Sequence, residues 1–203
     1  MYTTAVARLS QAQFLLSAAD PAQFPADFGA EVAFAGRSNA GKSSAINALV
    51  GRQGLARASK TPGRTRLINF FEISPQTRLV DLPGYGYASA PESERRAWPL
   101  LLEALRRRSS LKGMFVIVDA RRGITAGDRT LLEWAGPHHR AHVLLSKSDK
   151  LSRHEARQAL VAAAAALGET ASVQLFSAHT HAGLDEAQRM LSSWLEERAE
   201  AGA

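Results

Sequence analysis

One segment of the sequence has the residue types and the spacing of a phosphate-binding loop. Residues 36–43 read GRSNAGKS, which fits the pattern GxxxxGK[ST]. The glycines let the backbone approach an anion closely, and the N–H groups of the loop and of the following helix would face the α- and β-phosphates of a nucleotide. In this pattern Lys42 reaches the β- and γ-phosphates and the Ser43 hydroxyl binds Mg²⁺. An ordinary glycine-rich turn is the less favoured alternative, because a strand and a helix flank the loop in the required order.

A second motif, DLPG at residues 81–84, supplies a carboxylate and a turn beside that loop. It follows an apolar strand that ends at Val80. We therefore expect Asp81 at the edge of the sheet near the phosphates, where it would hold Mg²⁺ through a water molecule. The N–H of Gly84 would then be free to bind the γ-phosphate. A strand that merely ends in a Pro-Gly turn is the alternative.

Two later motifs predict which base the nucleotide carries. SKSD at residues 146–149 follows another apolar strand, and Asp149 can accept hydrogen bonds from the N1–H and the exocyclic amine of guanine. Adenine lacks that pair of donors and would leave the carboxylate unpaired. The aliphatic stem of Lys147 can cover one face of the base. FSA at residues 176–178 ends the next strand and would place the Ala178 N–H near the guanine carbonyl, so the set favours guanine.

Two long polar segments, residues 51–66 and 84–95, interrupt the apolar pattern where nucleotide-sensing loops are expected. In the first, Thr65 and Thr61 are the candidates for a Mg²⁺ ligand that binds when a γ-phosphate is present, and the family resemblance given below favours Thr65. Many GTPases have a glutamine directly after DxxG that orients the attacking water. This sequence has Tyr85 there, which predicts slow intrinsic hydrolysis that a partner or a cation accelerates.

These motifs need a sheet whose strands end side by side. Apolar runs alternate with helical patterns along the chain, which predicts an α/β fold: a three-layer α/β/α sandwich around a mostly parallel six-stranded sheet. With the motifs above, this architecture resembles the P-loop NTPase (Ras-like GTPase) type. Residues 1–30 have weak periodicity and are expected to form an N-terminal extension packed on a single GTPase domain, residues 31–203. Strands are expected at residues 31–35, 67–73, 78–80, 114–118, 142–145 and 173–176, and helices at residues 42–50, 92–109, 126–135, 152–167 and 183–199.

Composition and charge narrow the function classes. The sequence has no cysteine, which excludes disulfides and thiolate metal sites, and no apolar stretch long enough to span a membrane. We therefore expect a cytoplasmic protein without a membrane partner, and a monomer because no sustained heptad is visible. Between Glu31 and Glu72 there are seven positive charges and no acidic residue. This excess favours a polyanionic partner such as nucleic acid, and arginines kept for solubility are the alternative.

With these motifs in place, the sequence resembles the EngB/YsxC/YihA family of bacterial ribosome-biogenesis GTP-binding proteins, within the TrmE-Era-EngA-EngB-Septin-like P-loop GTPases. The resemblance rests on residues 34–44, on TPGRT at 61–65 with INFF at 68–71, and on DLPGYGY at 81–87. It implies binding of GTP or GDP with Mg²⁺ and a role in assembly of the large ribosomal subunit. The subunit precursor and its rRNA would be partners, and normal cell division would depend on the protein. Ser146 and Ser148 replace the Thr and Ala usual in the family, and neither change removes the carboxylate.

The resemblance also carries over roles residue by residue. It makes Ser43 and Thr65 the Mg²⁺ ligands, with Asp81 acting through water. Catalysis is assigned to no residue, and Asn39 and Thr65 are the candidates. In related GTPases an asparagine at the position of Asn39 helps to bind K⁺, whose charge assists hydrolysis; an amide that only stabilises the turn is the alternative. The expected GTP-binding residues are Gly36, Arg37, Ser38, Asn39, Ala40, Gly41, Lys42, Ser43, Ser44, Gly63, Arg64, Thr65, Arg66, Leu67, Asp81, Leu82, Pro83, Gly84, Ser146, Lys147, Ser148, Asp149, Phe176, Ser177 and Ala178.

Two other classes of function stay open on the sequence alone. A P-loop ATPase or kinase would need an adenine pocket or an acceptor site, and the SKSD motif argues against it. An RNA-binding module whose nucleotide site serves only structure is kept open by Tyr85, because turnover without a partner would then be negligible. GTP turnover on ribosomal particles separates the second class from a GTPase.

Overall fold

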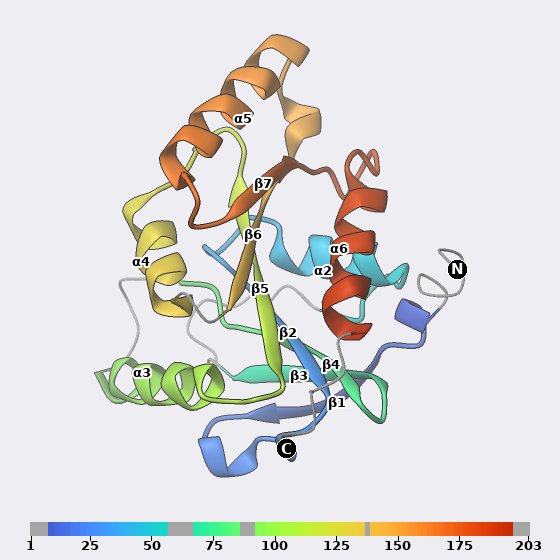
Figure 1. Ribbon diagram of the computed structural model, residues 1–203, viewed down its shortest axis with the longest axis vertical. Coiled ribbons are helices and arrows are strands. Elements are labelled where there is room, and N and C mark those ends of the chain that lie inside the picture. The colour runs from blue at the N-terminus through green and yellow to red at the C-terminus, as the bar shows by residue number, and fades with distance from the viewer. Residues whose placement is uncertain (1–7, 57–66, 86–91, 137–138, 197–203) are drawn as a thin grey trace.

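The computed structural model describes residues 8–56, 67–85, 92–136 and 139–196, with the backbone alone at residues 92–98. The strands form one sheet of seven in the order β1-β3-β4-β2-β5-β6-β7, and helices lie on both of its faces (Figure 1). The α/β sandwich is therefore confirmed. The strands are β1 Gln13–Ala18, β2 Ala30–Gly36, β3 Ile68–Ser74, β4 Thr77–Asp81, β5 Leu111–Asp119, β6 Arg140–Ser146 and β7 Ser172–Leu175; the helices are α2 Lys42–Val50, α3 Glu92–Arg106, α4 Ala126–Ala135, α5 Arg153–Leu167 and α6 Leu184–Glu196, with short 3-10 turns η1 Pro21–Gln23 and η2 Ser148–Lys150.

The sheet has one strand more than the sequence predicts. Residues 13–18, assigned from the sequence to an N-terminal extension, form β1 and pair antiparallel with β3 at the edge of the sheet. The segment lacks a regular alternation of polar and apolar residues, and the pairing is irregular between Phe14 and Leu16. Phe14 is 57% exposed, so β1 lacks the pattern of buried apolar residues that identifies the other strands in the sequence.

Two apolar layers enclose the central strands because successive side chains of a strand point to opposite faces. On one face, Val32 and Phe34 of β2 pack with α2 and α6, whose Ile46 and Trp194 are buried there. On the other face the alternate residues of β2 pack with α3, α4 and α5 (Figure 1). Burial on both sides explains why these strands read as continuous apolar runs in the sequence.

The register of the parallel strands places the ends of several motifs at one edge of the sheet. Phe34 of β2 lies opposite Asp81 of β4, and Gly36 lies opposite Ile117 of β5. Asp119, the last residue of β5, lies opposite Ser146, the last residue of β6. Polar residues that follow different strands are thus brought together, as expected at the carboxyl ends of an open α/β sheet.

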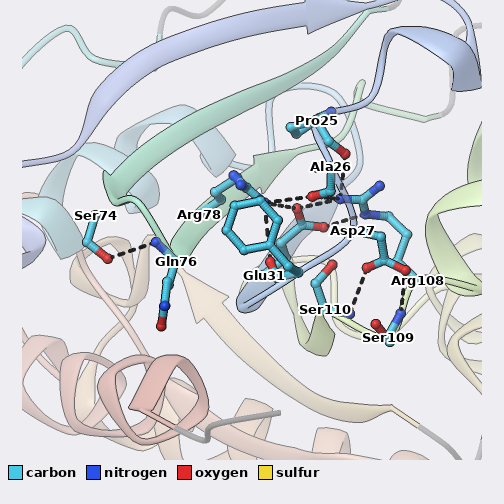
Figure 2. Close-up of polar contacts among 11 residues, drawn as sticks. Pro25, Ala26, Asp27, Glu31, Ser74, Gln76, Arg78, Arg108, Ser109 and Ser110 are labelled. Carbon is cyan, nitrogen blue, oxygen red and sulfur yellow. Dashed lines mark hydrogen bonds and ion pairs between the residues drawn. The ribbon is translucent and has the colours of Figure 1, made fainter. Parts of the chain in front are cut away.

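The opposite end of the sheet is held by a buried cluster of charges. Glu31 at the start of β2 is fully buried and accepts hydrogen bonds from Arg108 Nε at 2.7 Å and from Arg78 Nη1 at 3.1 Å (Figure 2). Both arginines also donate to backbone carbonyls of residues 25–28, and Asp27 accepts from the N–H groups of Ser109 and Ser110. The cluster therefore fixes residues 25–28 against β2, β4 and the end of the α3–β5 connection.

Candidate functional site

The loop between β2 and α2 has a backbone suited to an anion. Gly41 stands at the N-cap of α2 with φ of 100°, and Asn39 has φ of 65°, so both lie in the left-handed region. Gly41 has no side chain to cap the helix, which leaves the first N–H groups of α2 available to a ligand. Lys42, the first residue of α2, forms an ion pair with Asp81 at the end of β4, and both side chains are largely buried. The predicted phosphate-binding lysine and the predicted metal-associated carboxylate are thus in direct contact at the end of the phosphate loop.

The DLPG segment lies directly against this loop. The N–H of Ser38 donates to the Tyr85 carbonyl at 3.1 Å, and the Tyr85 N–H donates to the Gly36 carbonyl at 3.3 Å. Gly84 passes so close that a Cβ there would lie 2.7 Å from Ser38 Oγ and 3.1 Å from Ser38 Cα, so any side chain would displace Ser38. The side chain of Leu82 is buried in the core and Pro83 is partly buried. Leu82 can therefore contribute to a nucleotide site only through its backbone.

The Tyr85 side chain is turned toward α4. Its hydroxyl donates to the buried carboxylate of Asp128, which also accepts from the N–H and the hydroxyl of Thr125 in the capping box of α4. Burial and then the hydrogen bond with Asp128 raise the pKa of Tyr85, so the hydroxyl stays protonated. Since its only hydroxyl proton is used at Asp128, Tyr85 in this arrangement positions the segment after DxxG and does not take the place of the missing glutamine.

The predicted base-reading residues come together from two loops. Ser177 Oγ donates to Asp149 Oδ1 at 2.6 Å and accepts from the N–H groups of His179 and Thr180. Ser148 donates from both its N–H and its hydroxyl to the Phe176 carbonyl, at 3.2 and 3.0 Å, which ties the two loops to each other. The hydrogen bond from Ser177 lowers the pKa of Asp149, so the carboxylate is ionised at neutral pH and oriented.

These loops enclose a cavity of about 240 Å³ beside the N-terminus of α2. Ala178 is at its wall, whereas the Phe176 side chain is fully buried in the core and can present only its backbone. The volume suits a planar base, and a carboxylate at the wall supplies the acceptor that guanine requires. The lining residues are Gly41, Ser44, Ser146, Lys147, Asp149, Lys150, Phe176, Ala178 and His179.

One residue of the site, Asp119, was missed by sequence reasoning. Lys147, with a left-handed φ of 58°, places Nζ 2.6 Å from the Asn39 carbonyl and 3.0 Å from Asp119 Oδ2. Asp119 also receives the guanidinium of Arg121, at 2.9 Å on Oδ1 and 2.6 Å on Oδ2. The hydrogen bond with Arg121 and then that with Lys147 lower the pKa of Asp119, which stays ionised. A signal was present: Asp119 ends an apolar strand, as Asp81 does.

Ser146 completes the link between the base loop and the phosphate loop. Its hydroxyl donates to the Ala40 carbonyl and lies 3.0 Å from the Val118 carbonyl. Leu67 is described just before β3 and is partly buried. The remaining candidates of the first polar segment, Thr61 and Gly63 to Arg66, lie outside the described residues, and so does the predicted role of Thr65.

The donor set favours a hard cation at the phosphate end. The Ser43 hydroxyl on the first turn of α2 and the Asp81 carboxylate offer only oxygen atoms, the ligands that Mg²⁺ prefers. Within the described ranges there is no group of three or more His, Cys, Asp or Glu residues that would hold a metal by itself. That pattern fits an ion whose other ligands come from a bound phosphate and water.

The fold, the phosphate loop and the base cavity together define a P-loop GTPase domain. A family model described as 50S ribosome-binding GTPase matches residues 31–147. The chain is 49% identical to the probable GTP-binding protein EngB of Coxiella burnetii over 189 residues, which covers 91% of this chain and 92% of that protein. It is 52% identical to the protein of the same name from Azoarcus sp. over 190 residues, with 91% of each covered. The chain belongs to the EngB family of GTP-binding proteins, as the resemblance in the sequence predicts.

Solved structures agree on the fold. A crystal structure of a probable GTP-binding protein engB superposes with a TM-score of 0.66 and 23% identity, covering 83% of this chain and 100% of that one. Era in complex with MgGDPNP and a segment of 16S ribosomal RNA gives a TM-score of 0.60 with 21% identity, covering 85% of this chain and 58% of that one. In the part of the chain that the structure describes, no helix is long and apolar enough to cross a membrane.

Proposed function

We propose that this protein binds GTP and GDP with Mg²⁺, hydrolyses GTP slowly to GDP and phosphate, and acts as a monomeric cytoplasmic switch in assembly of the large ribosomal subunit. One observation carries the nucleotide part of the proposal. An ionised Asp149, oriented by Ser177, lines a base-sized cavity next to the N-terminus of α2. In that arrangement Asp149 would accept two hydrogen bonds from guanine, whereas adenine would leave the carboxylate unpaired.

The phosphate end would work through charge and positioning. Lys42 would turn from Asp81 to the β- and γ-phosphates, and the N–H groups at the start of α2 would bind the α- and β-phosphates. Ser43 would hold Mg²⁺ directly and Asp81 through water, with Thr65 as the further proposed ligand in the GTP state. Mg²⁺, when bound, supplies neutralisation of the phosphate charge. Gly84, which lies against Ser38, would offer its N–H to the γ-phosphate.

Slow hydrolysis follows from how Tyr85 is used. Tyr85, the residue after DxxG, donates its hydroxyl to Asp128 and forms backbone hydrogen bonds with the phosphate loop. It therefore has no group left to orient the attacking water. A partner or K⁺ would supply the missing stabilisation, with Asn39 as the candidate K⁺ ligand. The Asn39 side chain is exposed at the surface of the loop, where a cation can reach it.

The ribosomal role is supported by the family and by charge. The matched family model is described as a 50S ribosome-binding GTPase, and the chain has a net charge of +6. A basic protein of this kind is suited to rRNA in a precursor of the large subunit. The competing function, an RNA-binding module with a merely structural nucleotide, predicts no GTP turnover even when large-subunit particles are added.

The test is a change of base preference. We would measure equilibrium binding of GDP, a GTP analogue, ATP and xanthosine diphosphate with Mg²⁺ for the wild type, Asp149→Asn and the control Glu169→Gln, which removes one exposed acidic charge elsewhere. Wild type and control should bind the guanine nucleotides and not ATP. Asp149→Asn should lose about a hundredfold or more in GDP affinity and prefer the xanthine nucleotide, because two charge-assisted hydrogen bonds to guanine disappear and a complementary pair with xanthine forms. Equal binding of ATP and GTP by the wild type would refute guanine recognition.

A further inference from the structure

A second cavity lies beside the phosphate loop, on the side away from the base. It has a volume of about 240 Å³ and is enclosed by residues 37–40 of the loop and by residues 118–128, which connect β5 to α4. Of the residues that line it, only Lys147 also lines the base cavity. Neither Lys42 nor Ser43 lies on its wall. It therefore adjoins the expected nucleotide site through residues 37–40 but does not include Lys42 or Ser43, the residues expected to contact the phosphates and Mg²⁺.

Positive charge dominates this second cavity. Among the described residues that line it, four are cationic (Arg37, Arg121, Arg122 and Lys147) and two are acidic (Asp119 and Asp128). Both carboxylates are already occupied. Asp119 accepts from Arg121 and Lys147, and Asp128 accepts from Tyr85 and Thr125. Among the described residues of the wall, no further acidic group offsets the charge of Arg37 and Arg122.

Arg37 and Arg122 are the two guanidinium groups that remain available to a ligand. Both side chains are exposed, and neither forms an ion pair with any described residue. Arginine presents a planar fork of donors that matches a phosphate with two hydrogen bonds. Both residues line the same small concavity, where two guanidinium groups can together bind one phosphate.

We propose that this cavity, centred on Arg37 and Arg122, binds a backbone phosphate of RNA. The inference deepens the proposed function, because it places the RNA contact next to the nucleotide loop. The volume has room for about eight water molecules, hence for a phosphate with part of its sugar. The arginines stand at an exposed rim, so the chain on either side of the phosphate remains in solvent. A phosphodiester fits such an open mouth, whereas a free phosphate would leave much of its charge to water.

The experiment uses the full chain with GDP bound and an end-labelled, mixed-sequence single-stranded RNA, with affinity followed by fluorescence anisotropy over a range of KCl concentrations. Arg122→Gln removes one cation from the rim, and Arg157→Gln removes one exposed cation from α5 as the matched control. Removing one phosphate-binding cation should reduce the slope of log affinity against log salt by about 0.7 and weaken binding about three- to tenfold near physiological salt. Arg122→Lys keeps the charge and should retain most of the slope.

The outcomes separate this inference from the proposed function. A lower slope for Arg122→Gln alone, with GDP affinity equal in all variants, supports the phosphate site. Equal slopes for Arg122→Gln and Arg157→Gln overturn it, even if GDP binds normally. Calorimetry with inorganic phosphate tests the other source: binding that Arg122→Gln abolishes while the RNA slope stays unchanged would make the site one for free phosphate and overturn the RNA inference. Failure of GDP binding in the wild type would instead count against the proposed nucleotide function.

Discussion

Asp119 forms an ion pair with Lys147, the lysine that lines the predicted base site. A substitution of Asp119 should therefore weaken nucleotide binding, although Asp119 itself is not a predicted nucleotide contact. Asp119→Asn keeps the shape of the side chain and removes its charge. Lys147 Nζ would keep the Asn39 carbonyl at 2.6 Å and lose its ion pair with Asp119 Oδ2, which is 3.0 Å long. The lysine stem would then have to be ordered when the base binds.

The size of the effect follows from the burial of the pair. A hydrogen bond between charged groups contributes about 1.5–3 kcal/mol when it is shielded from water. The Asp119 side chain is 6% exposed, but that of Lys147 is 32% exposed, so solvent screening reduces this to about 1–2 kcal/mol. GDP affinity should therefore fall about five- to thirtyfold, since 1.4 kcal/mol is a factor of about ten. GDP and GTP analogues should be affected alike, because Lys147 lines the cavity proposed for the base and is not a proposed γ-phosphate contact.

The assay is stopped-flow dissociation and equilibrium binding of a fluorescent GDP analogue. Arg121→Gln is the matched control, because it removes the other ligand of Asp119 and leaves the bond to Lys147 intact. We expect Asp119→Asn to dissociate GDP faster and Arg121→Gln to stay within about twofold of the wild type. If both variants showed the same drop in affinity, Asp119 would act through the shape of the β5–α4 connection, and the inferred hold on Lys147 would be wrong.

Three further outcomes are expected. Burial lowers the pKa of His142, whose ring nitrogens contact Ser172 and Gln174. Between that lowered pKa and the usual value near 6.5, the unfolded chain binds more protons than the folded chain. The free energy of unfolding should therefore fall by up to about 1.4 kcal/mol per pH unit as the pH drops through this window. Glu31→Ala leaves two buried guanidinium groups without their carboxylate and should cost about 3–5 kcal/mol in urea unfolding, with GDP affinity unchanged. Replacing Na⁺ by K⁺ should raise GTP turnover about tenfold, and Asn39→Ala should abolish the difference.

Each of these has its own control. His142→Gln should flatten the dependence of unfolding on pH in that window, and an unchanged slope would assign it to other groups. An Ala substitution of Glu72, which is only partly buried on β3, should cost far less stability than Glu31→Ala. Equal turnover in K⁺ and Na⁺ would leave Asn39 with the role of stabilising the turn, where its φ of 65° already places an asparagine well.

The sequence predicts those parts of the fold in which burial produces a local, recognisable pattern of apolar residues. The strands β2, β5 and β6 are covered on both faces, so their apolar runs are continuous and their ends fall within a few residues of the prediction. β1 was missed for the opposite reason. It lies at an edge with Phe14 more than half exposed, and no periodic pattern distinguishes it from a packed extension.

The same division holds within the site. The phosphate loop, DLPG and SKSD were found because each is a short motif that follows a strand. The contacts that organise them join residues far apart in the chain, such as Lys147 with Asp119 and Tyr85 with Asp128. A single sequence carries no periodic signal for such pairs, since each depends on which strands become neighbours in the sheet.

The Lys147–Asp119 and Tyr85–Asp128 pairs both involve the segment that joins β5 to α4. Asp119 is the last residue of β5 and Asp128 lies in the first turn of α4, so the two flank the connection between β5 and α4, which carries neither a phosphate motif nor a base motif. One end fixes the base-side Lys147 and the other fixes Tyr85, the residue next to the glycine expected at the γ-phosphate. Arg121 and Arg122, between them, line the cavity inferred to bind an RNA phosphate. A ligand on these arginines would contact a segment that is hydrogen-bonded to both ends of the proposed nucleotide site, so RNA contact and nucleotide affinity should be thermodynamically linked in either direction.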